Sequence, residues 1–284
     1  MMNKMFRPER VFTDCEEVAS QLSDVTLLDL RRAEDFAMGH IAGAKHLDLY
    51  GVGLSNTAPE PLDAFLSMFD TLFGTRGVAL ERPVVVYYHE SGERSARAAW
   101  LLAVLDHPDV RLLDGGSTAW IAAGLPLAQI ESAPAHADPT RVPPTPPPLR
   151  GGRRMEWVAT RFDIAQAIDD DNTVILDVRR RSEYVGAEKR ARRVGTIPNA
   201  VHVFWREHLD SNGAMRTAEE VAALYESAGV TPDKNIIVFC QGGYRSASTF
   251  LALKALGYPN VSNYLGSWAE WGNRDDSRIT VPAA

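Results

Sequence analysis

The sequence predicts an α/β protein made of two similar domains, each an open parallel sheet flanked by helices. Three observations favour this fold class. The chain has 284 residues, which suits two domains of ordinary size. Matching segments recur in the two halves of the chain. Within each half, short apolar runs alternate with segments of helical periodicity, as in βαβ units.

The internal repeat is visible as pairs of segments in the same order. The matching pairs are residues 27–36 with 174–184, residues 39–44 with 195–200, and residues 85–96 with 236–247. The last pair aligns without a gap, and the same spacing of 151 positions relates Arg94 to Arg245 and Trp120 to Trp271. A constant spacing over so long a block indicates duplication.

A proline-rich segment at residues 133–152 separates the halves. Its stretch RVPPTPPPLRGG has too few backbone N–H donors for a helix or a sheet, and we interpret it as an extended, semi-rigid linker. The predicted domains are therefore residues 1–132 and residues 153–284, joined by residues 133–152.

The strand, loop and helix around Cys240 are predicted from local pattern. Four apolar residues, IIVF, precede Cys240, as expected of a strand buried on both faces. The segment SASTFLALKALG then shows helical periodicity and ends at Gly257, a predicted helix C-cap. Open parallel sheets place their sites at the carboxyl ends of strands, so Cys240 should lie at such a site.

The Cys240 loop has the chemistry of an activated thiol. Gly242 and Gly243 allow a tight turn whose N–H groups form an anion-binding nest. The following helix N-terminus and Arg245 add positive charge, which favours thiolate over thiol. We predict Cys240 as the catalytic nucleophile. The predicted substrate-binding residues are Gln241, Gly242, Gly243, Tyr244 and Arg245.

Two interpretations of Arg245 stay open at this point. In the first, its planar guanidinium binds the oxyanion end of an anionic substrate. In the second, Arg245 braces the loop or pairs with an acid elsewhere in the chain.

The other cysteine, Cys15, is predicted to be structural. It lies in TDCEEVASQL, a helix opened by Thr13 or Asp14, and has no Gly-rich loop or nearby cation. Two cysteines without CxxC spacing argue against a disulfide framework and a cysteine zinc site. A reducing compartment, the cytoplasm, suits this composition.

Charge and hydropathy exclude several other classes. The formal net charge of -7 offers no general basic field for nucleic acid. The basic runs at residues 179–181 and 189–193 are interpreted as solvated loops. No apolar stretch approaches the ~20 residues of a membrane span, and the N-terminus does not resemble a secretory signal.

Taken together, these motifs resemble the rhodaneses, the thiosulfate and mercaptopyruvate sulfurtransferases. The motifs that carry the resemblance are Asp-x-Arg with a trailing acidic and aromatic residue, GHIAGA and GTIPNA, the Cys-to-Arg loop, and a Gly-Gly-x-x-x-Trp-type segment that ends at Trp120 and at Trp271. The resemblance covers nearly the whole chain apart from the linker and tail. It implies a parallel-sheet α/β fold for each half and a ping-pong reaction. Cys240 would take sulfur from a small-molecule donor as a persulfide and pass it to cyanide or a thiol, without a metal or organic cofactor.

The first half departs from this pattern at the critical position, because His89 stands where Cys240 stands in the second half. The resemblance implies a catalytically inactive N-terminal domain that supports the second. His89 retains the capacity of any histidine to act as an acid or base.

Alternatives remain for the reaction and the donor. A cysteine phosphatase shares the fold, but its loop has five residues between Cys and Arg, whereas four stand between Cys240 and Arg245. A protein-to-protein sulfur-relay carrier is the alternative outside small-molecule enzymes. Glu183 occupies the place where two-domain family members often carry a substrate-binding arginine. Thiosulfate is therefore favoured as donor over 3-mercaptopyruvate.

Overall fold

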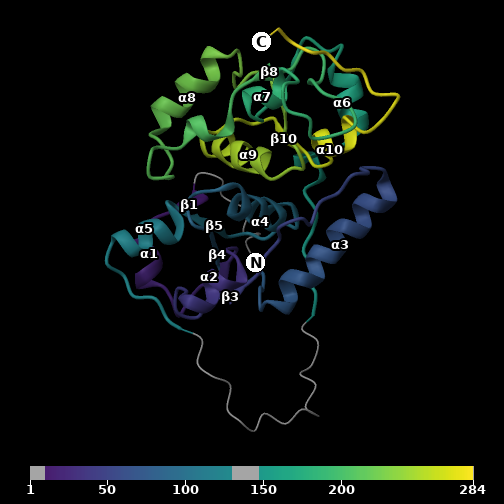
Figure 1. Cartoon of the computed structure of the whole chain (residues 1–284). Helices are drawn as coiled ribbons and strands as arrows, with labels where there is room; N and C mark the ends of the chain where they lie inside the picture. The colour runs from purple at the N-terminus through teal and green to yellow at the C-terminus, as the bar shows by residue number, and fades with distance from the viewer. Residues whose placement is uncertain (1–9, 130–146, 284) are drawn as a thin grey trace.

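The computed structural model describes residues 10–129 and 147–283, and it contains two five-stranded parallel sheets flanked by helices (Figure 1). The strand orders are β1-β5-β4-β2-β3 and β6-β10-β9-β7-β8. These orders are the same when the strands are counted within each half. The predicted fold class and internal repeat are thus confirmed.

Elements of the first half alternate between strands and helices along the chain. They are β1 (Phe12–Thr13), α1 (Cys15–Ser20), β2 (Thr26–Asp29), α2 (Ala33–Met38), β3 (Lys45–His46), α3 (Pro59–Thr75), β4 (Val84–Tyr87), α4 (Glu93–Val104), β5 (Val110–Leu113) and α5 (Gly116–Ala122). Strands β2, β4 and β5 are buried along their whole length, as a sheet covered on both faces requires.

The second half repeats this order after a 3₁₀ turn. Its elements are η2 (Met155–Trp157), β6 (Val158–Ala159), α6 (Arg161–Ala167), β7 (Thr173–Asp177), α7 (Arg181–Tyr184), β8 (Val201–His202), η3 (Trp205–His208), α8 (Ala218–Ser227), β9 (Asn235–Phe239), α9 (Arg245–Ala255), β10 (Val261–Tyr264) and α10 (Ser267–Trp271). Strand β9 lies between β7 and β10, so the chain leaves the middle of the sheet at Cys240.

The Asp-x-Arg motif is a buried structural unit in both halves. The Asp177 carboxylate accepts from the Arg179 backbone N–H at 3.0 Å and pairs with its guanidinium at 2.6 Å. Arg179 also donates to the Gly195 carbonyl at 2.7 Å, which ties the strand to the GTIPNA segment. Asp29, Arg31 and Gly39 make the same contacts. The prediction that residues 179–181 form a solvated loop is therefore wrong for Arg179.

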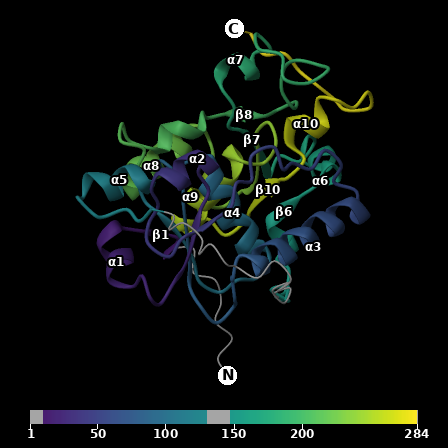
Figure 2. The same ribbon diagram turned by 60° about the horizontal axis from the view of Figure 1, so that its bottom comes forward.

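Helices α4 and α9 pack against each other and join the two domains (Figures 1 and 2). The Trp100 ring of α4 meets the Phe250 ring of α9 edge-on, with centroids 6.4 Å apart. Away from these helices, the Thr57 hydroxyl donates to the buried Glu270 carboxylate at 2.7 Å. One hydrophobic core contains buried residues of both halves, so each domain covers apolar surface of the other.

The predicted N-cap of α1 is confirmed, because the Asp14 side chain accepts from the Glu17 backbone N–H. The C-cap of α9 is Leu256 rather than the predicted Gly257, which follows it with a φ of 84°. Cys15 is buried in α1, and its pKa is raised by burial and by the charges of Asp14 and Asp114. A neutral, buried thiol agrees with a structural role for Cys15.

The predicted linker at residues 133–152 falls largely outside the described residues. Its described end, residues 147–152, forms neither helix nor strand. There the Leu149 and Arg150 backbone N–H groups donate to Asp70 of α3. The predicted domain limits stay a proposal.

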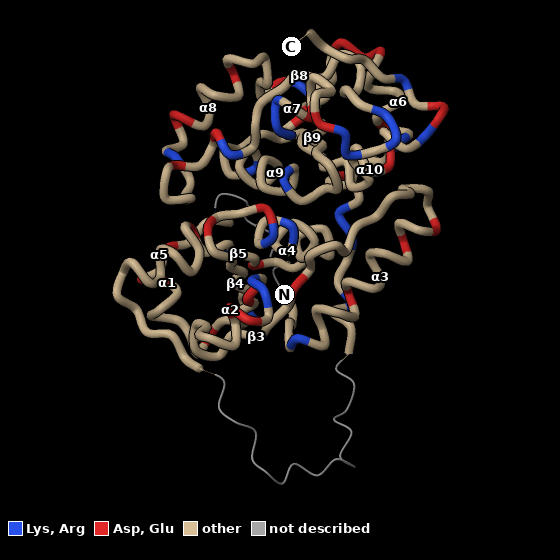
Figure 3. Tube along the Cα trace, in the orientation of Figure 1, with Lys and Arg blue, Asp and Glu red and all other residues tan. Residues whose placement is uncertain are grey.

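Basic and acidic residues are interspersed along both domains (Figure 3). No helix in the described part of the chain is long and apolar enough to cross a membrane.

Candidate active site

The Cys240 side chain lies at the carboxyl end of β9, separated by four residues from the first residue of α9, and is almost fully buried. Its Sγ accepts hydrogen bonds from the Gly243 backbone N–H at 3.2 Å and the Ser246 hydroxyl at 3.4 Å. Gly243 has a φ of 80°, which a residue with a Cβ adopts at a cost, whereas Gly242 lies outside this region. Of the two glycines predicted to shape the loop, Gly243 is the one that does so by its dihedral angle.

The N-terminus of α10 braces this loop from behind. The Trp268 and Ala269 backbone N–H groups donate to the Cys240 and Gln241 carbonyls at 3.0 and 2.8 Å. Ser267, with a φ of 51°, accepts from the Cys240 backbone N–H at 3.2 Å. The segment at residues 266–269 therefore holds the loop's carbonyl groups away from Sγ, so that N–H donors face the sulfur.

The surroundings of Cys240 favour its thiolate. Burial raises the pKa of the thiol, but the charge of Arg245, the Ser246 hydroxyl and backbone hydrogen bonds at Ser246 and Gly242 outweigh it, so the pKa lies below its usual value. The sequence-based expectation of an activated thiol agrees with this geometry. The catalytic role of Cys240 stays a prediction.

Arg245 is already engaged by a carboxylate. Its two terminal nitrogens pair with Glu183 at 2.5 and 3.0 Å, and the Glu183 side chain is fully buried. Burial raises the pKa of Glu183, but its bond to Arg245 outweighs this and holds the pKa below its ordinary value. The structure thus favours the second interpretation of Arg245, a brace that still contributes charge to Cys240.

A cavity of about 470 Å³ opens above Cys240 between the two domains. The second domain contributes Arg180 and Arg190 to its wall in addition to the Cys240 loop. The first domain contributes Tyr50 and Arg94, whose guanidinium lies 4.5 Å from the Tyr50 ring. Three arginines beside the loop make the cavity suitable for a small anion.

These three arginines are not among the site residues that the sequence predicts. Arg180 and Arg190 belong to the basic runs interpreted as solvated loops, and both are exposed at the cavity. Arg94 could have been found from the repeat, because it is the counterpart of Arg245.

The side chains of Gln241 and Tyr244 have partners of their own. Gln241 donates from Nε2 to the Arg190 carbonyl at 3.0 Å, which fixes the loop carrying that arginine. The Tyr244 hydroxyl lies 2.6 Å from the Leu49 carbonyl in the first domain. Both residues line the cavity, but their polar groups are bonded to the backbone of neighbouring loops and hold those loops in place.

The corresponding position in the first half holds a histidine beside an acid. His89 Nε2 lies 3.3 Å from the Asp35 carboxylate, and Asp35 is the repeat counterpart of Glu183. There is no thiol at this position, so the sulfur chemistry available at Cys240 has no equivalent here. The inactivity of the first domain stays a prediction.

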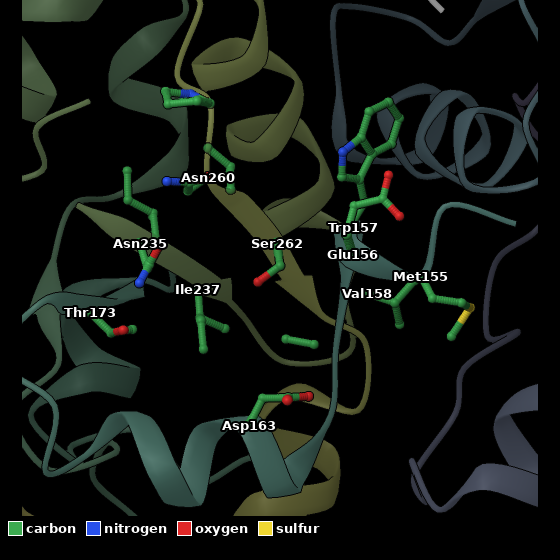
Figure 4. Close-up of a pocket in the computed structure, with 14 residues that line it drawn as sticks. Met155, Glu156, Trp157, Val158, Asp163, Thr173, Asn235, Ile237, Asn260 and Ser262 are labelled. Atoms are coloured by element: carbon green, nitrogen blue, oxygen red, sulfur yellow. The ribbon is translucent and has the colours of Figure 1, made fainter. Parts of the chain in front are cut away.

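A second cavity, of about 380 Å³, lies at the amino ends of β7, β9 and β10, opposite the Cys240 end of the sheet. Figure 4 shows Asp163, Asn235 and Ser262 among its labelled side chains. It is lined by neither cysteine nor histidine. In the described part of the chain, no three His, Cys, Asp or Glu side chains are grouped to hold a metal ion.

The family model for the Rhodanese-like domain matches the chain twice, at residues 14–123 and 161–274. The chain belongs to the rhodanese family. The predicted resemblance and tandem arrangement are thereby confirmed, with one match in each half.

Its relatives align with nearly the whole chain. It is 35% identical to a thiosulfate sulfurtransferase of Azotobacter vinelandii over 91% of this chain and 92% of the relative. It is 33% identical to the sulfur carrier protein TtuD of Thermus thermophilus over 93% and 94% of the two chains.

Solved structures show the same fold. A structure of EanB with ergothioneine superimposes with a TM-score of 0.81 at 21% identity, covering 98% of this chain and 72% of that one. A structure of YnjE gives 0.76 at 20% identity, covering 96% and 69%.

Proposed function

We propose that this rhodanese transfers sulfane sulfur from thiosulfate to cyanide or a thiol through a persulfide on Cys240. The observation that carries the proposal is the Cys240 sulfur, stabilised by N–H and O–H donors at the base of an arginine-lined cavity. The relatives named as thiosulfate sulfurtransferases and as a sulfur carrier support sulfur transfer. We place the reaction in the reducing cytoplasm, where the thiol stays available.

The two half-reactions use one sulfur atom of the protein. The Cys240 thiolate attacks the outer sulfur of thiosulfate, the S–S bond of thiosulfate breaks, and its electron pair leaves with sulfite. The acceptor then attacks the outer sulfur of the persulfide, and the electron pair of that S–S bond returns to Cys240. Gly243 and Ser246 hold the sulfur of Cys240 in both anionic states.

Arg94, Arg180 and Arg190 are the proposed contacts for the sulfonate end of the donor. Since Glu183 occupies both terminal nitrogens of Arg245, the cavity arginines are better placed to meet an incoming dianion. The same chemistry accommodates the carboxylate of 3-mercaptopyruvate, so donor preference is a quantitative question.

Arg180→Gln should raise KM for thiosulfate about three- to tenfold and leave kcat nearly unchanged, because it removes one exposed cation that attracts the donor before chemistry. Arg181→Gln is the matched control, since Arg181 is adjacent and does not line the cavity. Steady-state kinetics with thiosulfate and 3-mercaptopyruvate, at low and high salt, measure the effect. Equal effects of the two substitutions, or a higher kcat/KM for 3-mercaptopyruvate, would reject this donor assignment.

A sulfur-relay function is the second candidate, favoured by the similarity to the sulfur carrier protein. It uses the same persulfide and differs in the acceptor. If thiosulfate loads Cys240 but turnover with cyanide and small thiols is slow, the relay is the better description.

A further inference from the structure

Arg97 of α4 is buried without a carboxylate partner. Its side chain is completely inaccessible, and Nη1 donates to the Gly243 carbonyl at 3.1 Å. Its Nε and Nη2 atoms have no hydrogen-bond partner, and no acid pairs with it, among residues 10–129 and 147–283. A buried cation without a counter-charge is strongly unfavourable, so the counter-charge of Arg97 has to be sought nearby.

The groups around the Arg97 guanidinium are aromatic rings. Its central carbon lies 4.9 Å from the ring of Tyr244, 5.6 Å from Trp100 and 5.7 Å from Phe65. Ring faces attract a cation but carry no net charge. They account for how the guanidinium is accommodated, and they leave its charge uncompensated.

Cys240 is the anion that the geometry supplies. Gly243 touches both groups, because its carbonyl accepts from Arg97 and its N–H donates to the Cys240 sulfur at 3.2 Å. Burial lowers the pKa of Arg97 to about 10, while the charges of Tyr244 and Cys240 act in the opposite direction. The charge of Cys240 therefore favours the protonated form of Arg97 across the domain boundary, while Arg245 is the cation that most lowers the pKa of Cys240.

Of the buried charged groups around Cys240, Arg97 is the one without an acid partner in the described part of the chain. Arg245 and Glu183 form a bidentate pair and largely neutralise each other. Arg245 still lowers the pKa of Cys240, but unlike Arg97 it has an acid of its own. Asp177, also near Arg245, is paired with Arg179, and Asp48 is paired with Arg94. Further charged groups line the open cavity, where solvent reduces their effect: Glu93, Arg94, Arg180 and Arg190.

The repeat shows that Arg97 is no requirement of the fold. Its counterpart 151 positions later is Ser248, in the same turn of α9. A small hydroxyl thus suffices at this helix position in the second domain. The cation occurs in the domain that lacks a thiol, directly beneath the loop of the domain that has one.

We propose that Arg97 is a positioning residue of the first domain that provides the counter-charge for the Cys240 thiolate and persulfide. This inference rests on the proposed function for its persulfide part, whereas its thiolate part can be tested without any sulfur donor. It gives the first domain a definite task in the chemistry of the second.

Three substitutions separate charge from packing. Arg97→Gln retains a donor for the Gly243 carbonyl but removes the charge, Arg97→Met preserves bulk alone, and Arg97→Lys retains charge. In a Cys15→Ser background, the rate of alkylation by iodoacetamide as a function of pH reports the pKa of Cys240. We expect a rise of about one to two units with Gln and Met, and a value near that of the parent with Lys. Unfolding temperature, measured on the same samples, reports packing.

A folded Arg97→Gln protein with the parent's alkylation profile would overturn the proposal, even if thiosulfate turnover falls. If the parent protein neither turns over thiosulfate nor forms a persulfide, the proposed function is rejected. The effect of Arg97 on the pKa of Cys240 would still hold.

If the neutral variants do not fold, Cys240→Ala in the otherwise unchanged chain is the second test. Removing the thiolate leaves Arg97 without a counter-charge and should lower the free energy of unfolding. Because the pKa of Cys240 is lowered in the folded protein, the thiolate stabilises the fold more near pH 8 than near pH 5, and the loss of stability should be greater near pH 8. Cys15→Ala, at a buried thiol of raised pKa, is the matched control. A loss of stability for Cys240→Ala that is the same at both pH values would contradict the inference.

Discussion

Replacing Cys240 with serine is expected to reduce thiosulfate turnover about 10³-fold or more, to the uncatalysed background. The hydroxyl is close in size to the thiol and can accept the same hydrogen bonds from Gly243 and Ser246. It does not ionise at neutral pH, and it cannot store sulfur as a persulfide. Thiocyanate formation from thiosulfate and cyanide measures the loss.

Cys15→Ser is the control for this experiment, because Cys15 is a buried thiol in α1 of the other domain and its pKa is raised. Its turnover should stay within about twofold of the parent. A Cys240→Ser protein that keeps substantial turnover, or a Cys15→Ser protein that loses it while folded, would contradict the assignment.

The largest effect on stability is expected from Arg245→Met. This change removes the partner of Glu183, whose side chain is fully buried, and leaves a carboxylate without a counter-ion. Breaking one side of a buried ion pair costs about 3–5 kcal/mol of the free energy of unfolding. Denaturant unfolding at neutral pH measures it, and activity should fall as well, since Arg245 lowers the pKa of Cys240.

The pH dependence identifies the cause of this destabilisation. In the parent protein the pKa of Glu183 is lowered, so the pair stabilises the fold above the pKa of an unfolded glutamate and this contribution is lost as pH falls. Without Arg245 the buried carboxyl should have a raised pKa and be protonated readily. The difference between variant and parent should therefore shrink from pH 7 to about pH 4.

Arg94→Met is the matched control for Arg245→Met, because the two arginines are counterparts in the repeat. The Arg94 guanidinium lies 3.4 Å from a partly exposed Asp48 carboxylate, a contact worth about 0–1 kcal/mol. Equal losses of stability for the two variants would show that the buried pair with Glu183 stabilises the fold no more than the exposed contact with Asp48 does.

The sequence was sufficient to predict the fold and the position of Cys240 within it. A spacing of 151 positions reveals the repeat, and an apolar strand, a glycine loop and a helix place Cys240 at the carboxyl end of β9. These features are local or repeated, so pattern alone carries them.

What the sequence could not predict is how distant charges are matched. Glu183 and Arg245 are 62 positions apart, and Arg97 and Gly243 are 146 apart across a domain boundary. Neighbouring residues of one basic run also have different surroundings: Arg179 is buried against Asp177, whereas Arg180 lines the cavity. Periodicity does not specify which long side chain an interface will bury.

The most direct test of the account is the mass of the Cys240 peptide after the protein is incubated with thiosulfate and freed of excess donor. We predict a gain of one sulfur atom on Cys240 and none on Cys15, followed by its complete loss, with an equal yield of thiocyanate, when cyanide is added. Consumption of thiosulfate with an unmodified Cys240, or with the sulfur on another residue, would contradict the central claim.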